Sequence, residues 1–160
     1  MFSIKNKVIV VTGGNGLIGK QMVSSFRNQG AIVIAADIHF DRKSMDDIVI
    51  DITNENSVKN GIKILIEKYK HIDGWVNNAY PRTKDWGVKF EDIPFVSWSK
   101  NIDMHLNGYF LSCQIVLELM KKQGFGSLVN MSSIYGLVGP DFTIYEKTEM
   151  TMPAAYAAIK

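Results

Sequence analysis

The sequence predicts a doubly wound α/β fold, in which a parallel sheet carries helices on both faces. Three observations support this prediction. Short apolar runs rich in β-branched residues recur along the chain, as is typical of strands buried on both faces of a parallel sheet. Helical stripes of apolar residues alternate with these runs, as βαβ units require. A glycine-rich turn joins the first run to the first helical stripe.

Five apolar runs predict the strands, at residues 8–11, 31–36, 48–50, 72–76 and 127–131. The first intervening helix is expected to pack through Ile18, Met22 and Phe26, which recur every four residues. Gly30 follows and is expected to end it, because glycine adopts the left-handed conformation found after many helices.

Two longer helices are predicted farther along the chain. The first should bury one stripe, formed by Val58, Ile62, Leu65, Ile66 and Tyr69. The second is expected to be one long helix, ending before Gly124, with a buried face of Ile102, Leu106, Phe110, Cys113, Leu117 and Met120. Residues 78–94 are rich in proline and glycine and predict a loop. A last helix is expected to begin near Pro153.

Composition limits the class of protein. The 160 residues are 46% apolar, which suits a single domain (1–160) with a sizeable core. The 18 basic and 16 acidic residues form no basic stripe, so nucleic acid is not an expected partner. The N-terminus resembles neither a signal peptide nor a membrane span. Cys113 is the only cysteine, which excludes an internal disulfide and favours a cytoplasmic location. The three histidines lack metal-ligand spacing, so no metal site is expected.

The turn after the first strand has a pattern that suits a dinucleotide. It reads Gly13-Gly14-Asn15-Gly16-Leu17-Ile18-Gly19 and opens directly into the first helix. Gly14 would allow the tight turn, Gly16 the approach of a pyrophosphate, and Gly19 close packing of helix on strand. The helix N-terminus would face the anion. An ordinary glycine turn is the alternative interpretation.

Acidic residues follow the next two strands. Asp37 ends the second strand, 18 residues after Gly19, where a carboxylate can accept hydrogen bonds from the adenosine ribose. That carboxylate would repel a 2′-phosphate, which favours NAD over NADP, although Arg42 and Lys43 lie close by. Asp51 and Ile52 are placed to reach the adenine. Asp51 could equally cap the following helix.

A tyrosine and a lysine near the end of the chain suggest acid–base chemistry. Tyr156 and Lys160 are spaced i, i+4 and share one face of the predicted helix. A lysine cation beside a phenol favours loss of the phenolic proton, which makes tyrosine a usable acid or base. Tyr80 and Lys84 have the same spacing, but Pro81 argues against a helix there.

A serine pair, Ser132 and Ser133, follows the fifth strand, at the edge of the sheet where open α/β proteins bind ligands. A serine hydroxyl at this edge can hold a substrate oxygen while the tyrosine transfers the proton. Taken alone, the pair would more simply be the start of a loop.

Together these residues resemble the short-chain dehydrogenase/reductase family. Thr12 before the glycine loop, Asn77-Asn78-Ala79 after the fourth strand and the set of Ser133, Tyr156 and Lys160 carry the resemblance. It implies a Rossmann-type fold and NAD(P)-dependent hydride transfer between nicotinamide and an alcohol or carbonyl. Ser133 would orient the substrate, Tyr156 would be the acid/base, and Lys160 would bind the nicotinamide ribose. Asn78 and Ala79 would line the cofactor site.

Two positions depart from the family pattern. Tyr80 stands where the family's Asn-Asn-Ala motif ends in glycine, and His105 stands where a helical asparagine supports a proton relay. His105 or Asn107 could replace that asparagine, or His105 could simply be a packed side chain. The glycine loop and the interval from Ser133 to Tyr156 resemble the family's nucleotide-sugar branch. The mixture of features resembles the flagellin modification protein A group, which implies a sugar-derived substrate.

Two other functions remain open from the sequence. One is an extended-branch epimerase or dehydratase of nucleotide sugars, and the other is a non-catalytic NAD-binding module. The family resemblance also implies strands beyond Lys160 and a homo-oligomer. We therefore expect that the C-terminal strands are missing, that the domain is partial, and that this chain by itself is inactive.

Overall fold

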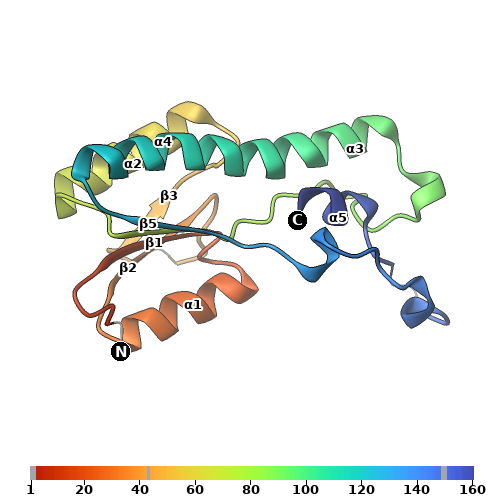
Figure 1. Ribbon diagram of the computed structural model, residues 1–160, viewed down its shortest axis with the longest axis horizontal. Coiled ribbons are helices and arrows are strands. Elements are labelled where there is room, and N and C mark those ends of the chain that lie inside the picture. The colour runs from red at the N-terminus through yellow and green to blue at the C-terminus, as the bar shows by residue number, and fades with distance from the viewer. Residues whose placement is uncertain (1–2, 43, 149–150) are drawn as a thin grey trace.

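A computed structural model describes residues 3–42, 44–148 and 151–160. Lys43, considered above for cofactor choice, lies outside them. The described residues form a five-stranded sheet in the order β3-β2-β1-β4-β5, in which every pair is parallel. Figure 1 shows the sheet between layers of helices. The strands are β1 (Val8–Thr12), β2 (Ile32–Asp37), β3 (Asp47–Val49), β4 (Gly74–Asn77) and β5 (Ser127–Asn130). The sequence-based prediction of a doubly wound parallel sheet is therefore confirmed.

The α-helices are α1 (Leu17–Asn28), α2 (Glu55–Tyr69), α3 (Phe95–Ile102), α4 (Gly108–Gln123) and α5 (Ala154–Ile159). A π-helical turn over Asp103–Asn107 joins α3 to α4. Three short 3₁₀ segments lie in the loops: η1 (Phe90–Asp92), η3 (Ile134–Gly136) and η4 (Phe142–Tyr145).

Two apolar cores lie on opposite faces of the sheet, with α1 on one side and α2 and α4 on the other (Figure 1). Val11 and Val33 face α1, together with Val23 of that helix. The larger core contains the fully buried Trp75 and the predicted stripe of α2, whose Val58 is also fully buried. In the described ranges no helix is long and apolar enough to cross a bilayer.

The predicted packing face of α1 is partly wrong. Met22 and Phe26 pack against the core as expected, but Ile18 is 56% exposed and Val23 takes the central buried position. Ile18 lies in the first helical turn, beyond the strand end, where no layer of the sheet covers it. This exposure suits a residue that faces a ligand rather than the core.

The predicted long helix is interrupted by the π-helical turn, and its predicted buried face is partly wrong, although Met120 is buried as expected. Leu106, Phe110 and Leu117 are exposed, and Cys113 is half-buried. The buried side is smaller and more polar, and consists of Asn101, His105, Gly108, Ser112, Val116 and Met120. A Cβ on Gly108 would lie 3.1 Å from Ile52 Cδ1, so the helix packs too closely for a large side chain at this position. Close packing over the sheet therefore sets the buried face.

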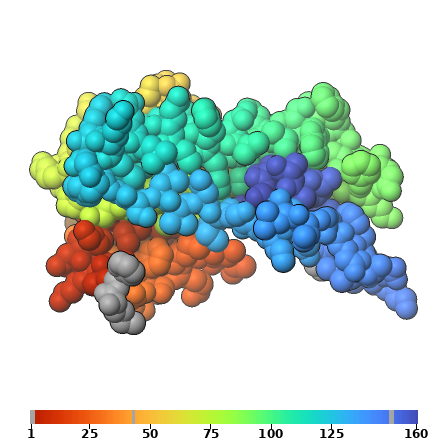
Figure 2. Space-filling model, in the orientation of Figure 1, coloured from red at the N-terminus to blue at the C-terminus, as the bar shows by residue number. Residues whose placement is uncertain are grey.

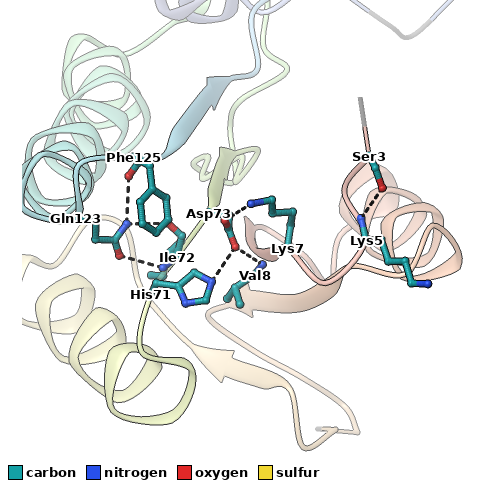
Figure 3. A network of polar contacts seen from close by, with 9 residues as sticks. All are labelled: Ser3, Lys5, Lys7, Val8, His71, Ile72, Asp73, Gln123 and Phe125. Carbon is teal, nitrogen blue, oxygen red and sulfur yellow. Dashed lines mark hydrogen bonds and ion pairs between the residues drawn. The ribbon is translucent and has the colours of Figure 1, made fainter. Parts of the chain in front are cut away.

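Asp73 fastens the amino end of the sheet. Its carboxylate accepts hydrogen bonds from Lys7 Nζ (2.9 Å) and from the Val8 N–H (2.8 Å), and it contacts His71 Nε2 at 3.0 Å (Figure 3). Burial raises the pKa of Asp73, but the bonds from Lys7 and Val8 outweigh it and hold that pKa below its usual range. The carboxylate thus ties the start of β1 to the start of β4.

Gln123, at the end of α4, joins a third element to this end of the sheet. Its side chain accepts from the Ile72 N–H and donates to the carbonyls of Ile72 and Phe125 (Figure 3). The turn at Gly124 has φ +80°, as predicted for the residue that ends this helix.

We predict that Asp73→Asn lowers the free energy of unfolding by about 1–3 kcal/mol at pH 7, because the buried Val8 N–H and Lys7 lose a charged acceptor. The Asp73 pKa is depressed in the folded state, so its contribution is present above the unfolded pKa of about 3.9 and is lost as the pH falls through the folded value. Urea unfolding at pH 7 and pH 3 tests this, with the exposed Asp92→Asn as control. Equal losses in the two variants at pH 7 would contradict it.

Candidate active site

The strand order reverses between β1 and β4, and the candidate site lies at the carboxyl ends of these strands. Thr12 ends β1 and is fully buried. Its hydroxyl donates to the Val76 carbonyl (3.2 Å) and accepts from the N–H groups of Asn78 (3.0 Å) and Ala79 (3.1 Å). One threonine thus fixes the loop after β4 beside the glycine loop.

The glycine loop is held from both sides. Gly13 has φ +63°, and a Cβ there would lie 2.7 Å from Ala79 Cα, so only glycine fits. A Cβ on Gly19 would lie 2.0 Å from the Gly13 carbonyl oxygen, which explains the close packing of α1 on the loop. Asn78 donates its side-chain amide to the carbonyls of Thr12 and Gly13. Asn78 therefore holds the backbone at the start of the glycine loop.

The open side of the loop faces outward. A Cβ on Gly16 would meet only the Gly13 carbonyl oxygen at 3.1 Å, and Gly16, Leu17 and Ile18 are exposed. Gly16 caps α1 without a side chain, and the first turn of α1 has no acidic residue. The positive end of the helix dipole is therefore left for an external anion.

Asp37 ends β2, as predicted, and its carboxylate lies against the glycine loop. It accepts from the Asn15 N–H at 3.0 Å and from the Ile38 N–H at 2.8 Å. Asp51 accepts from both the N–H and the hydroxyl of Thr53. The cap of α2 is Asn54 and not Asp51, because Asn54 accepts from the Ser57 N–H. Ile52 is buried beneath α4.

A hollow of about 350 Å³ lies beside the loop, between α1 and β2. Gly14 and Asn15 line it, together with the basic side chains of Lys20, Arg27 and Arg42. Arg42 therefore lies close to the position where Asp37 meets Asn15. The Asp37 carboxylate favours NAD, whereas the Arg42 guanidinium favours the 2′-phosphate of NADP. The geometry alone therefore leaves the choice between NAD and NADP open.

Tyr156 and Lys160 lie on α5, which begins after Pro153 as predicted. Lys160 Nζ donates to the Met131 carbonyl (2.7 Å) at the end of β5 and lies 5.8 Å from the centre of the Tyr156 ring. The Ser132 hydroxyl donates to the Lys160 carbonyl. Ser133 follows and accepts from the Tyr135 N–H (3.2 Å) as the cap of η3, which leaves its own proton free to donate. Because η3 packs on α5, the candidate serine lies beside the tyrosine helix.

Three tyrosine rings surround the Lys160 ammonium, at 5.7 Å for Tyr80, 5.4 Å for Tyr109 and 5.8 Å for Tyr156. Burial lowers the pKa of Lys160. Burial raises the pKa of both Tyr80 and Tyr109, and the nearby Tyr156 adds to each shift. These two phenols stay protonated at neutral pH, and Tyr109 donates to the Ala79 carbonyl. Tyr156 differs from them in its position, one helical turn before Lys160.

His105 lies in the π-helical turn and is completely buried. Its ring packs on Tyr80 (5.1 Å between centroids) and on Tyr109 (4.8 Å). Neither ring nitrogen has a hydrogen-bond partner among the described residues. Burial, with the Lys160 charge, lowers the pKa of His105 to about 4, so the imidazole is neutral at pH 7. Asn107 is exposed and donates to Asp103, so His105 is the residue that faces the site.

Sequence reasoning missed Tyr109, and it treated Tyr80 as a competing match to the Tyr156 pattern and as a departure from the family motif. The loop conformation of residues 78–83 confirms that the Tyr80 copy is not helical, yet its ring packs on Tyr156 at 5.8 Å. Tyr109 could have been found, because it follows His105 by four residues on a helical path. Thr12 gave no signal of its own, since a threonine at a strand end is common.

The residues present fit a dinucleotide. The loop offers an open backbone at Gly16, an uncapped helix terminus and a carboxylate at Asp37, in the order that a pyrophosphate and a ribose require. Ala79, in the loop after β4, packs against Gly13 and accepts a hydrogen bond from Tyr109, which links the glycine loop to the residues around Lys160. The glycine loop and the residues around Lys160 therefore share one edge of the sheet.

Known proteins show the same arrangement. Residues 7–146 match the short chain dehydrogenase family. The chain is 33% identical to post-translational flagellin modification protein A of Campylobacter coli, over 98% of this chain and 67% of that protein. It is 32% identical to the NAD-dependent glycerol dehydrogenase of Listeria innocua, over 88% of this chain and 58% of that protein.

A solved short chain dehydrogenase from Leptospira borgpetersenii with bound NAD⁺ superposes with a TM-score of 0.84 and 29% identity, over 98% of this chain and 61% of that one. The chain thus spans between 58% and 67% of the length of these three proteins. The family match over most of the chain, the parallel sheet and the glycine loop agree, and the chain belongs to the short-chain dehydrogenase/reductase family.

Proposed function

We propose that the whole protein is an NAD-dependent oxidoreductase that transfers a hydride between nicotinamide and the alcohol or carbonyl carbon of a small molecule. The carrying observation is the position of Tyr156 and Lys160 beside the end of β5, on the same sheet edge as the glycine loop. The similarity to flagellin modification protein A supports a role in the modification of flagellin or of surface glycans, and we propose a sugar derivative as the substrate.

The cofactor would be held by the glycine loop, with the pyrophosphate at the start of α1, the adenosine ribose at Asp37, and the adenine near Asp51 and Ile52. NAD is proposed over NADP because the Asp37 carboxylate lies directly on the loop and would repel a 2′-phosphate. The named relative from Listeria innocua is NAD-dependent, and the Leptospira structure holds NAD⁺. When bound, the nicotinamide supplies or accepts the hydride.

The proposed chemistry divides between three side chains. The Ser133 oxygen accepts a hydrogen bond from the Tyr135 N–H. Its hydroxyl proton is left to donate a hydrogen bond to the substrate oxygen. Tyr156 gives its phenolic proton to that oxygen during reduction, or takes it during oxidation. The Lys160 ammonium lies beside the Tyr156 ring and stabilises the phenolate that remains.

His105 is proposed to return protons to this centre. A neutral imidazole donates at one nitrogen and accepts at the other, and both nitrogens here are free of protein partners in the described part of the chain. The charge of Lys160 acts on the ring, so the two groups are close enough to interact. We propose that His105 takes part in the proton relay at the position where the family pattern has asparagine.

We also propose a cytoplasmic protein that forms a homo-oligomer. The single cysteine suits a reducing compartment. The exposed apolar side chains of Leu106, Phe110 and Leu117 lie along α4 and the turn before it, and such a stripe is typical of a protein–protein contact.

The tyrosine assignment predicts that Tyr156→Phe in the whole protein lowers kcat by about 100-fold or more, because proton transfer is lost, while NAD still binds. Tyr80→Phe should keep most of the activity, since the phenyl ring retains the contacts with Trp86 and His105. NAD-linked turnover and NAD titration of both variants test the assignment. If Tyr80→Phe were the inactive variant, the wrong tyrosine would have been chosen.

The cofactor assignment predicts that the wild type binds NAD more tightly than NADP, and that Asp37→Ala weakens NAD binding roughly tenfold or more, the loss expected for a charged hydrogen bond. Asp37→Asn keeps an acceptor for the Asn15 N–H, so it separates the loss of the negative charge from the loss of this hydrogen bond. The neighbouring Asp41→Ala, whose side chain is 87% exposed, controls for the change in net charge. Tighter binding of NADP by the wild type would overturn the assignment.

Buried His105 predicts a pH dependence of stability. Its folded pKa of about 4 lies below the unfolded value of about 6.5, so the unfolded state binds the proton first as the pH falls. The contribution of His105 to the free energy of unfolding is therefore fully present above about pH 6.5. Between about pH 6.5 and 4 the free energy of unfolding falls by roughly 2–4 kcal/mol through this residue. Urea unfolding across this window should show a smaller loss in His105→Asn than in the wild type. The exposed His39→Asn should behave as the wild type does, and identical slopes in all three proteins would refute the prediction.

A further inference from the structure

A basic hollow lies next to the candidate site and is not used by the proposed chemistry. It has a volume of about 500 Å³ and is lined by Arg82, Thr83, Lys84, Trp86 and Gly87. In Figure 2 the segment before α3 lies beside α5, at the end of the molecule away from the N-terminus. Trp86 packs edge-on against Tyr80 at 5.3 Å, and Tyr80 packs on Tyr156 at 5.8 Å. The hollow is therefore two ring contacts away from the proposed acid/base.

The charge of the hollow is uncompensated. Arg82 and Lys84 are both exposed, and neither makes an ion pair with any described residue. The closest acid in sequence, Asp85, accepts a hydrogen bond of 2.6 Å from the Ser97 hydroxyl of α3. Arg82 itself lies over the Tyr80 ring at 5.8 Å. Two cations thus line one hollow while their nearest acid is bonded to another element.

The loop is held in place by buried polar groups. The Thr83 N–H donates to Asn101 Oδ1 (3.0 Å), and Asn101 Nδ2 donates to the Thr83 hydroxyl (2.9 Å). The Thr83 and Ser97 hydroxyls are 3.0 Å apart. Asn101 is only 3% exposed, so these bonds are shielded from water. Arg82 and Lys84 flank Thr83 in the sequence, and both line the hollow beside this anchored residue.

We propose that this hollow, called the basic hollow below, binds an anionic oxo group of the substrate, a phosphate or a carboxylate. A guanidinium binds either group through two parallel hydrogen bonds, and a lysine adds a second charge. Trp86 and Tyr80 offer aromatic surface between the hollow and Tyr156, on which the carbon skeleton of a sugar can rest. The substrate would then be an acidic sugar derivative, oriented by its anion at one end while the reacting carbon faces Tyr156. This inference rests on the proposed function for the identity of the reacting end.

Binding of sugars without turnover tests the basic hollow directly. The probes are glucose 6-phosphate, glucuronate and glucose, which differ in the anion, and the signal is the indole N–H resonance of Trp86, assigned with Trp86→Phe. We expect one or both anionic sugars to bind with Kd near or below about 1 mM, and glucose to bind at least tenfold more weakly. The tighter anion identifies phosphate or carboxylate as the group recognised.

Variants then locate the site. Arg82→Gln and Lys84→Gln should each weaken the anionic sugar roughly tenfold, the loss of one charged contact. Lys89→Gln, an exposed lysine of the same loop that does not line the hollow, should change binding less than twofold. Equal binding of glucose and the anionic sugars, absence of binding, or an equal loss in Lys89→Gln would overturn the proposal. Anion binding without any NAD-linked turnover would instead overturn the proposed function and leave the basic hollow supported.

Discussion

The candidate site depends on the junction of β1 and β4. At this point the strand order reverses, because β2 and β3 lie on one side of β1, and β4 and β5 lie on the other. The buried Thr12 hydroxyl makes three hydrogen bonds there, and each joins the end of β1 to the end of β4 or its loop. Asn78 adds two more bonds to the glycine loop, and Gly13 leaves no space for a side chain against Ala79. These bonds and contacts hold the glycine loop on its inner side, while the backbone around Gly16 stays open to solvent.

The same junction is linked through Ala79 to the residues around Lys160. Ala79 receives its N–H bond from the junction and offers its carbonyl to Tyr109, which borders Lys160. Lys160 is held from the other side by the Met131 carbonyl at the end of β5. Burying an ammonium is costly unless polar groups face it, and here a carbonyl and three aromatic rings do so. The cation therefore stays in the site without a carboxylate partner among the described residues, and its charge can act on Tyr156.

Much of the fold could be predicted from the sequence because its signals are local. The β-branched runs found all five strands, and Gly30 and Gly124 marked helix ends through their need for positive φ. The face of the α3–α4 segment could not be predicted in this way. Apolar periodicity chose Leu106 and Phe110, but the tight approach of Gly108 to Ile52 turns the small and polar side inward. The exposed apolar residues then serve as outer surface, which a single sequence cannot distinguish from core.

The site itself was predictable in its parts but not in its assembly. Spacing identified Tyr156 and Lys160, since they lie on one helix, whereas Tyr80 and Tyr109 come from different elements and meet Lys160 only in three dimensions. The bonds that hold Thr83 to Asn101 and Ser97 are equally invisible in the sequence, because they join a loop to a helix through common polar residues. The spacing of Tyr156 and Lys160 is set by helix geometry, whereas the position of the loop that carries Arg82 is set by its hydrogen bonds to α3. On the proposal made above, the loop would select the anion of the substrate, while the C-terminal helix would supply the reacting groups.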